Sequence, residues 1–277
     1  MQNNTVFVLV HGAWHNALHW NPVANLLSLA GYGVVAIDLP GHGLKAKYPA
    51  SYLTQDVPAL LEEPTPLGAD TFEDYCAPVI SAVQTISPDT RIILVGHSMG
   101  GIVVTKVADL LADRIARVVY VTAFCPVRFP NSLGYISSPQ FEGVHNSAYI
   151  GDPSATGAVR INPRSNNPTD LEDLRACFYS DMSMADAIPF ITCLTPDLPF
   201  SAISADTRGT TAGWGRVPRT YVRCTQDRAL PIASQDMMIA DADAEYLENP
   251  FTVRSLKSSH SPFASMPKEL AQLLMQS

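Results

Sequence analysis

Short apolar runs alternate with longer segments of helical periodicity along most of the chain. The runs are rich in β-branched residues and fall at Val6–Val10, Gly33–Ile37, Arg91–Val95, Val118–Thr122, Thr220–Cys224 and Thr252–Leu256. Helical patterns lie near residues 20–30, 71–86, 100–112, 232–241 and 267–275. This alternation predicts an α/β fold with a mainly parallel sheet flanked by helices. Because ligands bind beyond the carboxyl ends of such strands, we expect the functional residues at that edge.

Two stretches interrupt the alternation. Residues 44–70 are rich in proline and loop-like, and residues 125–217 carry many prolines and polar clusters, with short helical pieces at 170–179 and 183–194. The second stretch is too long for a plain connection between two strands. We therefore predict a single structural domain built from three parts: a core formed by 1–124 and 218–277, an inserted and mostly helical cap at 125–217, and a loop insertion near the active site at 44–70.

The composition narrows the class of protein. Hydrophobic residues make up 47% of the chain and charged residues only 16%, against a usual share of about 25%. These values exclude disorder and allow a large core. The net charge of −8 argues against a nucleic acid or an anionic membrane as partner. No apolar run approaches the roughly 18 residues of a membrane span, so we expect no membrane partner.

The N-terminus and the cysteines indicate a compartment. Residues 1–4 lack the basic start of a secretory signal, and the apolar run that follows is too short for one. The five cysteines are widely scattered without a CxxC pair, which favours reduced core thiols over disulfides or a zinc site. We expect a cytoplasmic protein, as a monomer or homodimer.

The strongest chemical motif follows the third predicted strand. Residues 92–95 run into Gly96-His97-Ser98-Met99-Gly100, and an apolar helical segment begins directly afterwards. A strand, G-x-S-x-G and a helix form the nucleophile elbow, in which a strained turn presents the serine at a helix N-terminus. The flanking glycines lack bulk, so the helix can pack on the strand. This context favours Ser98 as a nucleophile over a plain glycine-rich turn.

A serine nucleophile needs a base and an acid, and this fold supplies them in the order serine, acid, histidine. Asp227 follows the strand Thr220–Cys224, and His260 follows the last strand, so both are expected at the same edge as Ser98. Asp227 would fix the tautomer of His260, which would shuttle the proton. Asp227 could instead cap the helix near Pro231, and His260 could be an ordinary loop histidine. His97 and His145 are competing bases.

The loop after the first strand reads His11-Gly12-Ala13-Trp14-His15. The backbone N–H groups of Ala13 and Met99 are our candidate oxyanion donors. The four-residue spacing of His11, His15 and His19 suggests a metal site, but such spacing gathers ligands only on a helix and no carboxylate accompanies it. We predict no metal and no cofactor, and expect His11 to brace the loop by hydrogen bonding.

Several segments together resemble a known group of proteins. They are FVLVHGAWHNALHW, VVAIDLPGHG, ILVGHSMGG, RTYVRCTQDRALP, SSHSPF and the cap segment FYSDMSMADA. They are similar to the α/β-hydrolase branch of plant methylesterases, hydroxynitrile lyases and related bacterial carboxylesterases. The resemblance implies the α/β-hydrolase fold, with Ser98, Asp227 and His260 as nucleophile, acid and base and with Ala13 and Met99 as oxyanion donors. Residues 44–70 depart from the plant members, which have a short link there.

The resemblance also separates two chemistries. The hydroxynitrile lyases of this branch carry a threonine where Gly12 stands and a lysine directly after the catalytic histidine, where this chain has Ser261. That lysine stabilises the departing cyanide, so its absence favours hydrolysis. We predict a serine carboxylic-ester hydrolase that acts through an acyl-enzyme. Cleavage of lactone, thioester, amide or carbon–carbon bonds is the alternative, and a complete triad argues against a non-enzymatic ligand receptor.

The substrate pocket is expected to be apolar. Gly12 allows close approach of the first loop, and the candidate wall residues, each of which could equally be ordinary core, are Trp14, Phe124, Phe178, Phe190 and Trp214. No basic cluster surrounds the motifs, which argues against anionic substrates. A small-molecule ester is the expected partner, namely a methyl or short-chain ester of an apolar or aromatic acid.

Overall fold

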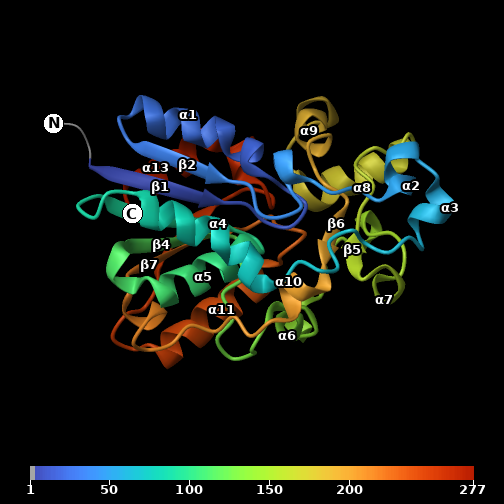
Figure 1. The fold of residues 1–277 in the computed structure, drawn as a ribbon. Coiled ribbons are helices and arrows are strands. Elements are labelled where there is room, and N and C mark those ends of the chain that lie inside the picture. Colours follow the sequence, from blue (N-terminus) through green and yellow to red (C-terminus); the bar gives the residue numbers. More distant parts are fainter. Residues whose placement is uncertain (1–3) are drawn as a thin grey trace.

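Six parallel strands form the central sheet of the computed structural model, which describes residues 4–277 (Figure 1). Their spatial order is β2-β1-β3-β4-β7-β8, and every neighbouring pair is parallel. The strands are β1 (Thr5–Val10), β2 (Gly33–Ile37), β3 (Arg91–His97), β4 (Ile115–Val121), β7 (Arg219–Cys224) and β8 (Thr252–Leu256). The predicted α/β architecture is confirmed, and the strands differ from prediction only at their ends.

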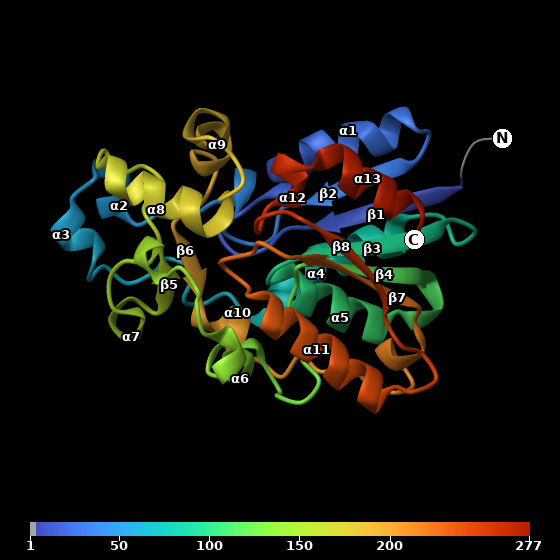
Figure 2. The same cartoon turned by 180° about the vertical axis from the view of Figure 1, so that it is seen from behind.

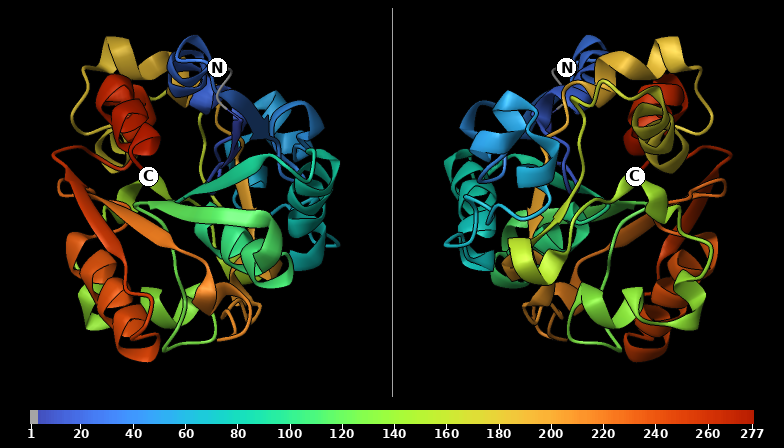
Figure 3. Two further views of the ribbon diagram at one scale, coloured as in Figure 1. Left: turned by 90° about the vertical axis from the view of Figure 1, so that its left-hand side faces the viewer. Right: turned by 90° about the vertical axis from the view of Figure 1, so that its right-hand side faces the viewer.

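Helices cover both faces of this sheet (Figures 2 and 3). Phe7 and Leu9 point to one face, where they belong to the apolar cluster that includes α1 and α13. Val8 and Val10 point to the other face, into the larger cluster with α4, α5 and α11. The helices of the core are α1 (Asn21–Leu29), α4 (Phe72–Thr85), α5 (Gly100–Leu110), α11 (Ile232–Glu245), α12 (Pro262–Ser265) and α13 (Pro267–Met275). Burial on both faces explains the nearly continuous apolar strands.

The segment between β4 and β7 gathers at one end of the core (Figure 1). Its two longest helices, α8 and α9, correspond to the two helical pieces expected there. It also contains a two-stranded antiparallel sheet of β5 and β6 that the sequence pattern did not indicate. The elements are α6 (Ser132–Ile136), α7 (Pro153–Thr156), β5 (Ala158–Arg160), α8 (Pro168–Phe178), α9 (Met184–Ile191), β6 (Asp197–Pro199) and α10 (Phe200–Ser204). We call residues 125–217 the cap.

Residues 44–70 pack against the cap and are more ordered than a loop. They contain the short helices α2 (Ala50–Thr54) and α3 (Val57–Leu60), so the expectation of a loop-like segment is wrong here. The Asp56 side chain caps α3 by accepting the N–H of Ala59. The sequence analysis gave more weight to the surrounding prolines than to this capping residue and therefore predicted a loop. The Thr65 N–H donates to the Thr156 carbonyl at 2.8 Å and ties this segment to the cap.

A buried ion pair lies where this segment meets the small sheet. The Arg160 guanidinium donates from Nε and Nη2 to the two Asp197 carboxylate oxygens, at 2.6 and 2.8 Å. Its Nη1 donates to the carbonyls of Leu60 and Glu63 in the 44–70 segment. Arg160 and Asp197 are 0% and 1% exposed. One side chain therefore joins β5, β6 and α3.

Two further features bear on the compartment predictions. Among residues 4–277, no helix has the length and hydropathy needed to cross a membrane. All five cysteines are free thiols, and four are buried, whereas Cys193 is exposed. The expectation of core thiols is therefore wrong for Cys193, because it lies just after α9 on the surface of the cap.

Candidate active site

The G-x-S-x-G segment forms a tight turn between β3 and α5. Ser98 has φ of 52°, a left-handed conformation that is uncommon outside glycine. A Cβ at Gly96 would lie 2.7 Å from Val104 Cγ2, and one at Gly100 would lie 2.5 Å from the His11 carbonyl oxygen. Both glycines are therefore required sterically, because the helix packs directly against the strand and against the loop after β1. The strain concentrates at Ser98, as expected of a nucleophile elbow.

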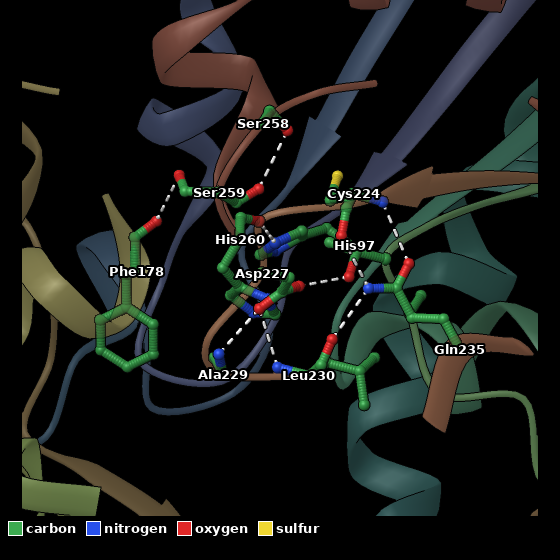
Figure 4. Close-up of polar contacts among 12 residues, drawn as sticks. His97, Phe178, Cys224, Asp227, Ala229, Leu230, Gln235, Ser258, Ser259 and His260 are labelled. Atoms are coloured by element: carbon green, nitrogen blue, oxygen red, sulfur yellow. Dashed lines mark hydrogen bonds and ion pairs between the residues drawn. The ribbon is translucent and has the colours of Figure 1, made fainter. Parts of the chain in front are cut away.

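Asp227 and His260 lie beside each other after β7 and β8. His260 Nδ1 donates to Asp227 Oδ2 at 2.7 Å (Figure 4). Asp227 Oδ1 accepts the backbone N–H groups of Ala229 and Leu230 at 2.7 and 2.8 Å, and Oδ2 also accepts the Thr122 hydroxyl. Asp227 thus ties down its own loop, rather than capping α11, whose N-cap is Pro231. The carboxylate assigns the proton to Nδ1, which leaves His260 Nε2 as an acceptor.

Ser98 and His260 line one cavity with the two candidate oxyanion residues. The cavity has a volume of about 250 Å³, and Ser98, His260, Ala13 and Met99 all contribute to its wall. Within residues 4–277, Ser98 and His260 share no side-chain hydrogen bond. Catalytic hydrogen bonds are often long in ligand-free enzymes and shorten once substrate is bound.

The backbone N–H groups of Ala13 and Met99 have no protein acceptor among the described residues. Met99 directly precedes α5, so its N–H lies at the positive end of a helix dipole. The chain turns sharply after Ala13, because Trp14 has φ of 60°. Two buried donors without partners in the wall that holds Ser98 form a pocket suited to a developing oxyanion.

Most of the cavity wall is apolar. The aromatic residues Trp14, Phe124 and Phe178 lie on it, as the sequence predicts. The prediction of Gly12 as a pocket residue is wrong, because Gly12 does not line the cavity but packs against Ser98, where a Cβ would come 2.5 Å from Ser98 Cβ. None of the described Lys, Arg, Asp or Glu residues lines the cavity. The remaining wall residues are Ile136, Phe141, Asn146, Tyr149, Val159, Leu198, Ile203 and Ala229.

Two predicted wall residues lie elsewhere. Phe190 packs on the far side of the first loop, where its ring is 6.0 Å from that of Tyr179 and its carbonyl accepts His19 Nε2–H. Trp214 is buried beside the sheet, where its indole N–H donates to the Tyr120 hydroxyl at 2.7 Å and the Arg219 guanidinium covers its ring. Neither ring lines the cavity that contains Ser98, so the prediction of Phe190 and Trp214 as pocket walls is wrong.

Several buried histidines surround the first loop without forming a ligand set. His11 donates from Nδ1 to the Gly12 carbonyl and accepts the Leu39 N–H at Nε2, so it braces the loop as predicted. His15 contacts the Ala13 carbonyl and the Tyr179 hydroxyl in the same way. No group of three His, Cys, Asp or Glu residues in the described chain is arranged to hold a metal ion.

Burial keeps these histidines neutral. Desolvation, with smaller contributions from neighbouring imidazoles, lowers the pKa of His11, His15 and His97 well below the ordinary value. Desolvation also lowers the pKa of His19 to about 4 and, to a lesser degree, the pKa of His42. His260 therefore shares its surroundings with uncharged imidazoles at neutral pH.

The two competing histidines are engaged elsewhere. His97 Nε2–H donates to the backbone carbonyl of His260 at 2.8 Å, so its side chain supports the His260 loop (Figure 4). Among the described residues it makes no hydrogen bond to the Ser98 side chain and contacts no carboxylate. His145 pairs with Asp173 at 3.0 Å inside the cap. Of the three histidines weighed as bases, only His260 both lines the cavity and contacts a carboxylate.

A family model described as the alpha/beta hydrolase family matches residues 7–273. The chain belongs to the α/β hydrolase family. Among its relatives, norfluorocurarine synthase 2 from a Strychnos species is 29% identical, with 98% of this chain and 94% of the relative covered. Methylesterase 7 from Arabidopsis thaliana is also 29% identical, over 99% and 96% of the two chains. Polyneuridine aldehyde esterase from Rauvolfia serpentina is 26% identical, over 97% and 94%.

Solved structures share the fold of this α/β hydrolase. A pyrethroid hydrolase from Sphingobium faniae JZ-2 superposes with a TM-score of 0.78 at 24% identity, covering 98% of this chain and 96% of the other. Polyneuridine aldehyde esterase superposes with a TM-score of 0.73 at 22% identity, covering 98% of each chain. The fold is thus shared over nearly the whole chain.

The sequence analysis did not predict Thr122 or the remaining wall residues of this hydrolase's site, among them Tyr149. Thr122, which directly follows β4, contacts Asp227, but a threonine after a strand carries no motif. Tyr149 stacks on Trp14 with ring centroids 5.5 Å apart and lines the cavity from the cap. The cap loop around Tyr149 has no periodicity, so only the three-dimensional arrangement identifies it.

Proposed function

We propose that this α/β hydrolase is a serine carboxylic-ester hydrolase that acts on small neutral esters. The observation that carries the proposal is the His260–Asp227 hydrogen bond of 2.7 Å beside a strained Ser98 in one apolar cavity. The relatives named methylesterase and esterase support the same chemistry.

The proposed reaction has two halves. His260 Nε2 accepts the proton of Ser98 Oγ while the oxygen attacks the ester carbonyl, and the Ala13 and Met99 N–H groups receive the oxyanion. His260 then protonates the leaving alcohol, and an acyl-enzyme remains. Water repeats the sequence and releases the acid. Asp227 stays ionised and stabilises the imidazolium in both halves.

The cavity favours compact and uncharged substrates. Its volume of about 250 Å³ lies just below the usual range of roughly 300–1,000 Å³ for small-molecule sites. Trp14, Phe124 and Phe178 offer flat apolar surfaces to an acyl group. We therefore propose methyl or short-chain esters of an apolar or aromatic acid as the substrate class.

The arrangement around Gly12 argues against cyanohydrin cleavage. A side chain at position 12 would collide with Ser98, since even a Cβ would lie 2.5 Å from Ser98 Cβ. The threonine used by the lyases of this branch therefore has no room here. Ser261 is buried beside His260 and offers no positive charge to a departing cyanide.

A fluorophosphonate probe tests this proposal. It should label the wild-type protein, and Ser98→Ala should abolish both labelling and hydrolysis of a panel of methyl and short-chain esters. Ser132→Ala is the matched control, because Ser132 is a fully buried serine of α6 without a hydrogen-bond partner for its hydroxyl. Equal labelling of wild type and Ser98→Ala would disprove the nucleophile. Release of cyanide from a cyanohydrin would disprove the assignment as a hydrolase.

His260 must be neutral to act as the base, so ester hydrolysis should decline on the acid side. A rate that stays flat between about pH 5 and 8 would contradict the role of His260.

A further inference from the structure

Thr122 lies between the strand that leads to Ser98 and the strand that leads to Asp227. It directly follows β4, which lies between β3, leading to Ser98, and β7, leading to Asp227. Its N–H donates to the Val222 carbonyl of β7 at 2.9 Å, and its hydroxyl donates to Asp227 Oδ2. The side chain is fully buried. Thr122 is therefore fixed to the strand that carries the acid.

The backbone of Thr122 is in an unfavourable conformation. Its φ is 38°, and positive φ is a genuine outlier for a β-branched residue. Such strain persists where the surrounding structure holds it, often at functional sites. Among the described residues, the Thr122 hydroxyl makes no hydrogen bond besides that to Asp227. The strained turn aims one hydroxyl at one carboxylate oxygen.

That oxygen is the one that receives His260 Nδ1–H. Asp227 Oδ1 is already held by the N–H groups of Ala229 and Leu230, so Oδ2 is shared between Thr122 and His260. Two donors on one oxygen compete for its electron density. The Thr122 hydroxyl thus sets both the direction of the carboxylate and the strength with which it accepts from the imidazole.

We propose that Thr122 is a positioning residue that acts through Asp227, keeping the carboxylate in the plane required by His260 and moderating its attraction for the imidazolium. This inference rests on the proposed hydrolase function. A hydrogen bond to an ionised carboxylate stabilises the charge where it is, so removing the donor makes Oδ2 a stronger partner for protonated His260. Protonated His260 then persists to higher pH, while Asp227 is free to turn about its Oδ1 contacts.

The titratable groups that face His260 and Asp227 among residues 4–277 are the same in the variants compared below. His97 and His15 face His260 from β3 and from the loop after β1, and burial lowers the pKa of both well below the ordinary value. From the cap, Asp181 accepts the Ser259 N–H at 3.0 Å. Tyr149, Cys177, Tyr221 and Cys224 face Asp227, and burial raises the pKa of each, so they stay neutral.

Three variants test the proposal. Thr122→Val removes the donor and keeps the shape, whereas Thr122→Ser keeps the donor. Thr105→Val is the matched control, because Thr105 is equally buried and its hydroxyl bonds to the Gly101 carbonyl and the Tyr120 hydroxyl, away from Asp227.

For Thr122→Val we expect kcat to fall roughly tenfold, as for loss of one hydrogen bond to a charged group, with KM nearly unchanged. The acid limb of the kcat/KM profile should move up by about half a pH unit. Thr122→Ser should keep kcat and the position of the acid limb close to those of the wild type, and Thr105→Val should leave the acid limb in place.

A second measurement needs no substrate. The His260 Nδ1 proton, held at 2.7 Å by Asp227, should give a far-downfield proton NMR signal that disappears in Asp227→Ala. In Thr122→Val this signal should move further downfield, because the proton faces a stronger acceptor, and Thr105→Val should not move it.

An unchanged signal in Thr122→Val would overturn the proposal even if no ester is cleaved. An equal kcat loss in Thr122→Ser and Thr122→Val would also overturn it. Failure of the probe to label Ser98 would instead count against the proposed function.

Discussion

The core and the cap of this protein differ in how much polar contacts add to apolar burial. The core is a sheet with apolar side chains on both faces, and the two clusters that include Phe7 and Val8 account for its burial. The cap has short elements and shares the larger of these clusters through residues such as Leu174 and Ile191. It also has polar contacts between distant segments, among them the Arg160–Asp197 pair and its bonds to the 44–70 segment. Apolar burial thus stabilises both regions, and in the cap directional hydrogen bonds between distant segments add to it.

This difference has a functional counterpart. The core supplies Ser98, Asp227 and His260 from turns at strand ends, where rigid neighbours fix their directions. The cap supplies cavity walls such as Phe178 and Tyr149. Changes in the core are therefore expected to alter chemistry, whereas changes in the cap should alter stability and substrate fit.

The largest effect is expected for Asp227→Asn, which tests whether chemistry can be lost from the core without loss of fold. The amide would present its N–H to His260 and favour the wrong tautomer, so kcat should fall by about 10⁴-fold. Steady-state kinetics and thermal melting should show an inactive protein of near-normal stability. Asp236→Asn, at a half-exposed carboxylate paired with Arg223, is the control. Retention of more than about a tenth of the activity would contradict the role of Asp227.

Arg160→Met tests the polar anchoring of the cap. It would leave Asp197 buried without a partner and remove the donors to Leu60 and Glu63, which should cost about 3–5 kcal/mol. Urea unfolding would measure the loss, and hydrogen exchange should show it first in β5, β6 and α3.

The matched control is Arg216→Met, which breaks an exposed pair with Asp113 and should cost at most about 1 kcal/mol. The double variant Arg160→Met/Asp197→Leu should recover much of the loss, since no buried charge remains. If Arg160→Met lowered the free energy of unfolding no more than Arg216→Met does, the stability of the cap would not depend on this ion pair.

A smaller loss of stability is expected at acid pH from His19, which lies where the core contacts the cap. His19 donates to the Phe190 carbonyl of the cap, and burial lowers its pKa to about 4, against about 6.5 when unfolded. Between these values the unfolded chain binds more protons than the folded one. The stabilising contribution is therefore complete above about pH 6.5 and is lost as the pH falls toward 4, by roughly 1.4 kcal/mol per unit of pKa difference.

Urea midpoints measured from pH 7 to pH 5 should fall, and His19→Gln should flatten part of that slope. A midpoint independent of pH over this range would show that the buried histidines take up protons without cost.

Most of the core could be predicted from the sequence because its apolar residues repeat with the period of its elements. β2 and β8 match the predicted ranges at both ends, and α13 does as well. Motif chemistry also placed Ser98, Asp227 and His260 at one edge, since turns after parallel strands meet there. The structure brings these three residues together, while their catalytic roles stay part of the proposed function.

The remainder was not predictable for specific physical reasons. Arg160 and Asp197 lie 37 residues apart and carry no pattern that indicates pairing. Phe190 and Trp214 are aromatic like the true wall residues, and only the packing of α9 and the sheet decides which rings reach the cavity. Thr122 became visible only through its contact with Asp227.

Trp14 couples the two regions mechanically. Its carbonyl accepts both the N–H and the hydroxyl of Thr195, and its indole donates to the Val159 carbonyl, so three hydrogen bonds join it to the cap. Ala13, the candidate oxyanion donor, is the preceding residue. Any motion that lifts the cap must therefore break these bonds or drag the donor out of place. An open form would admit an ester without activating it, so turnover would be conditional on closure.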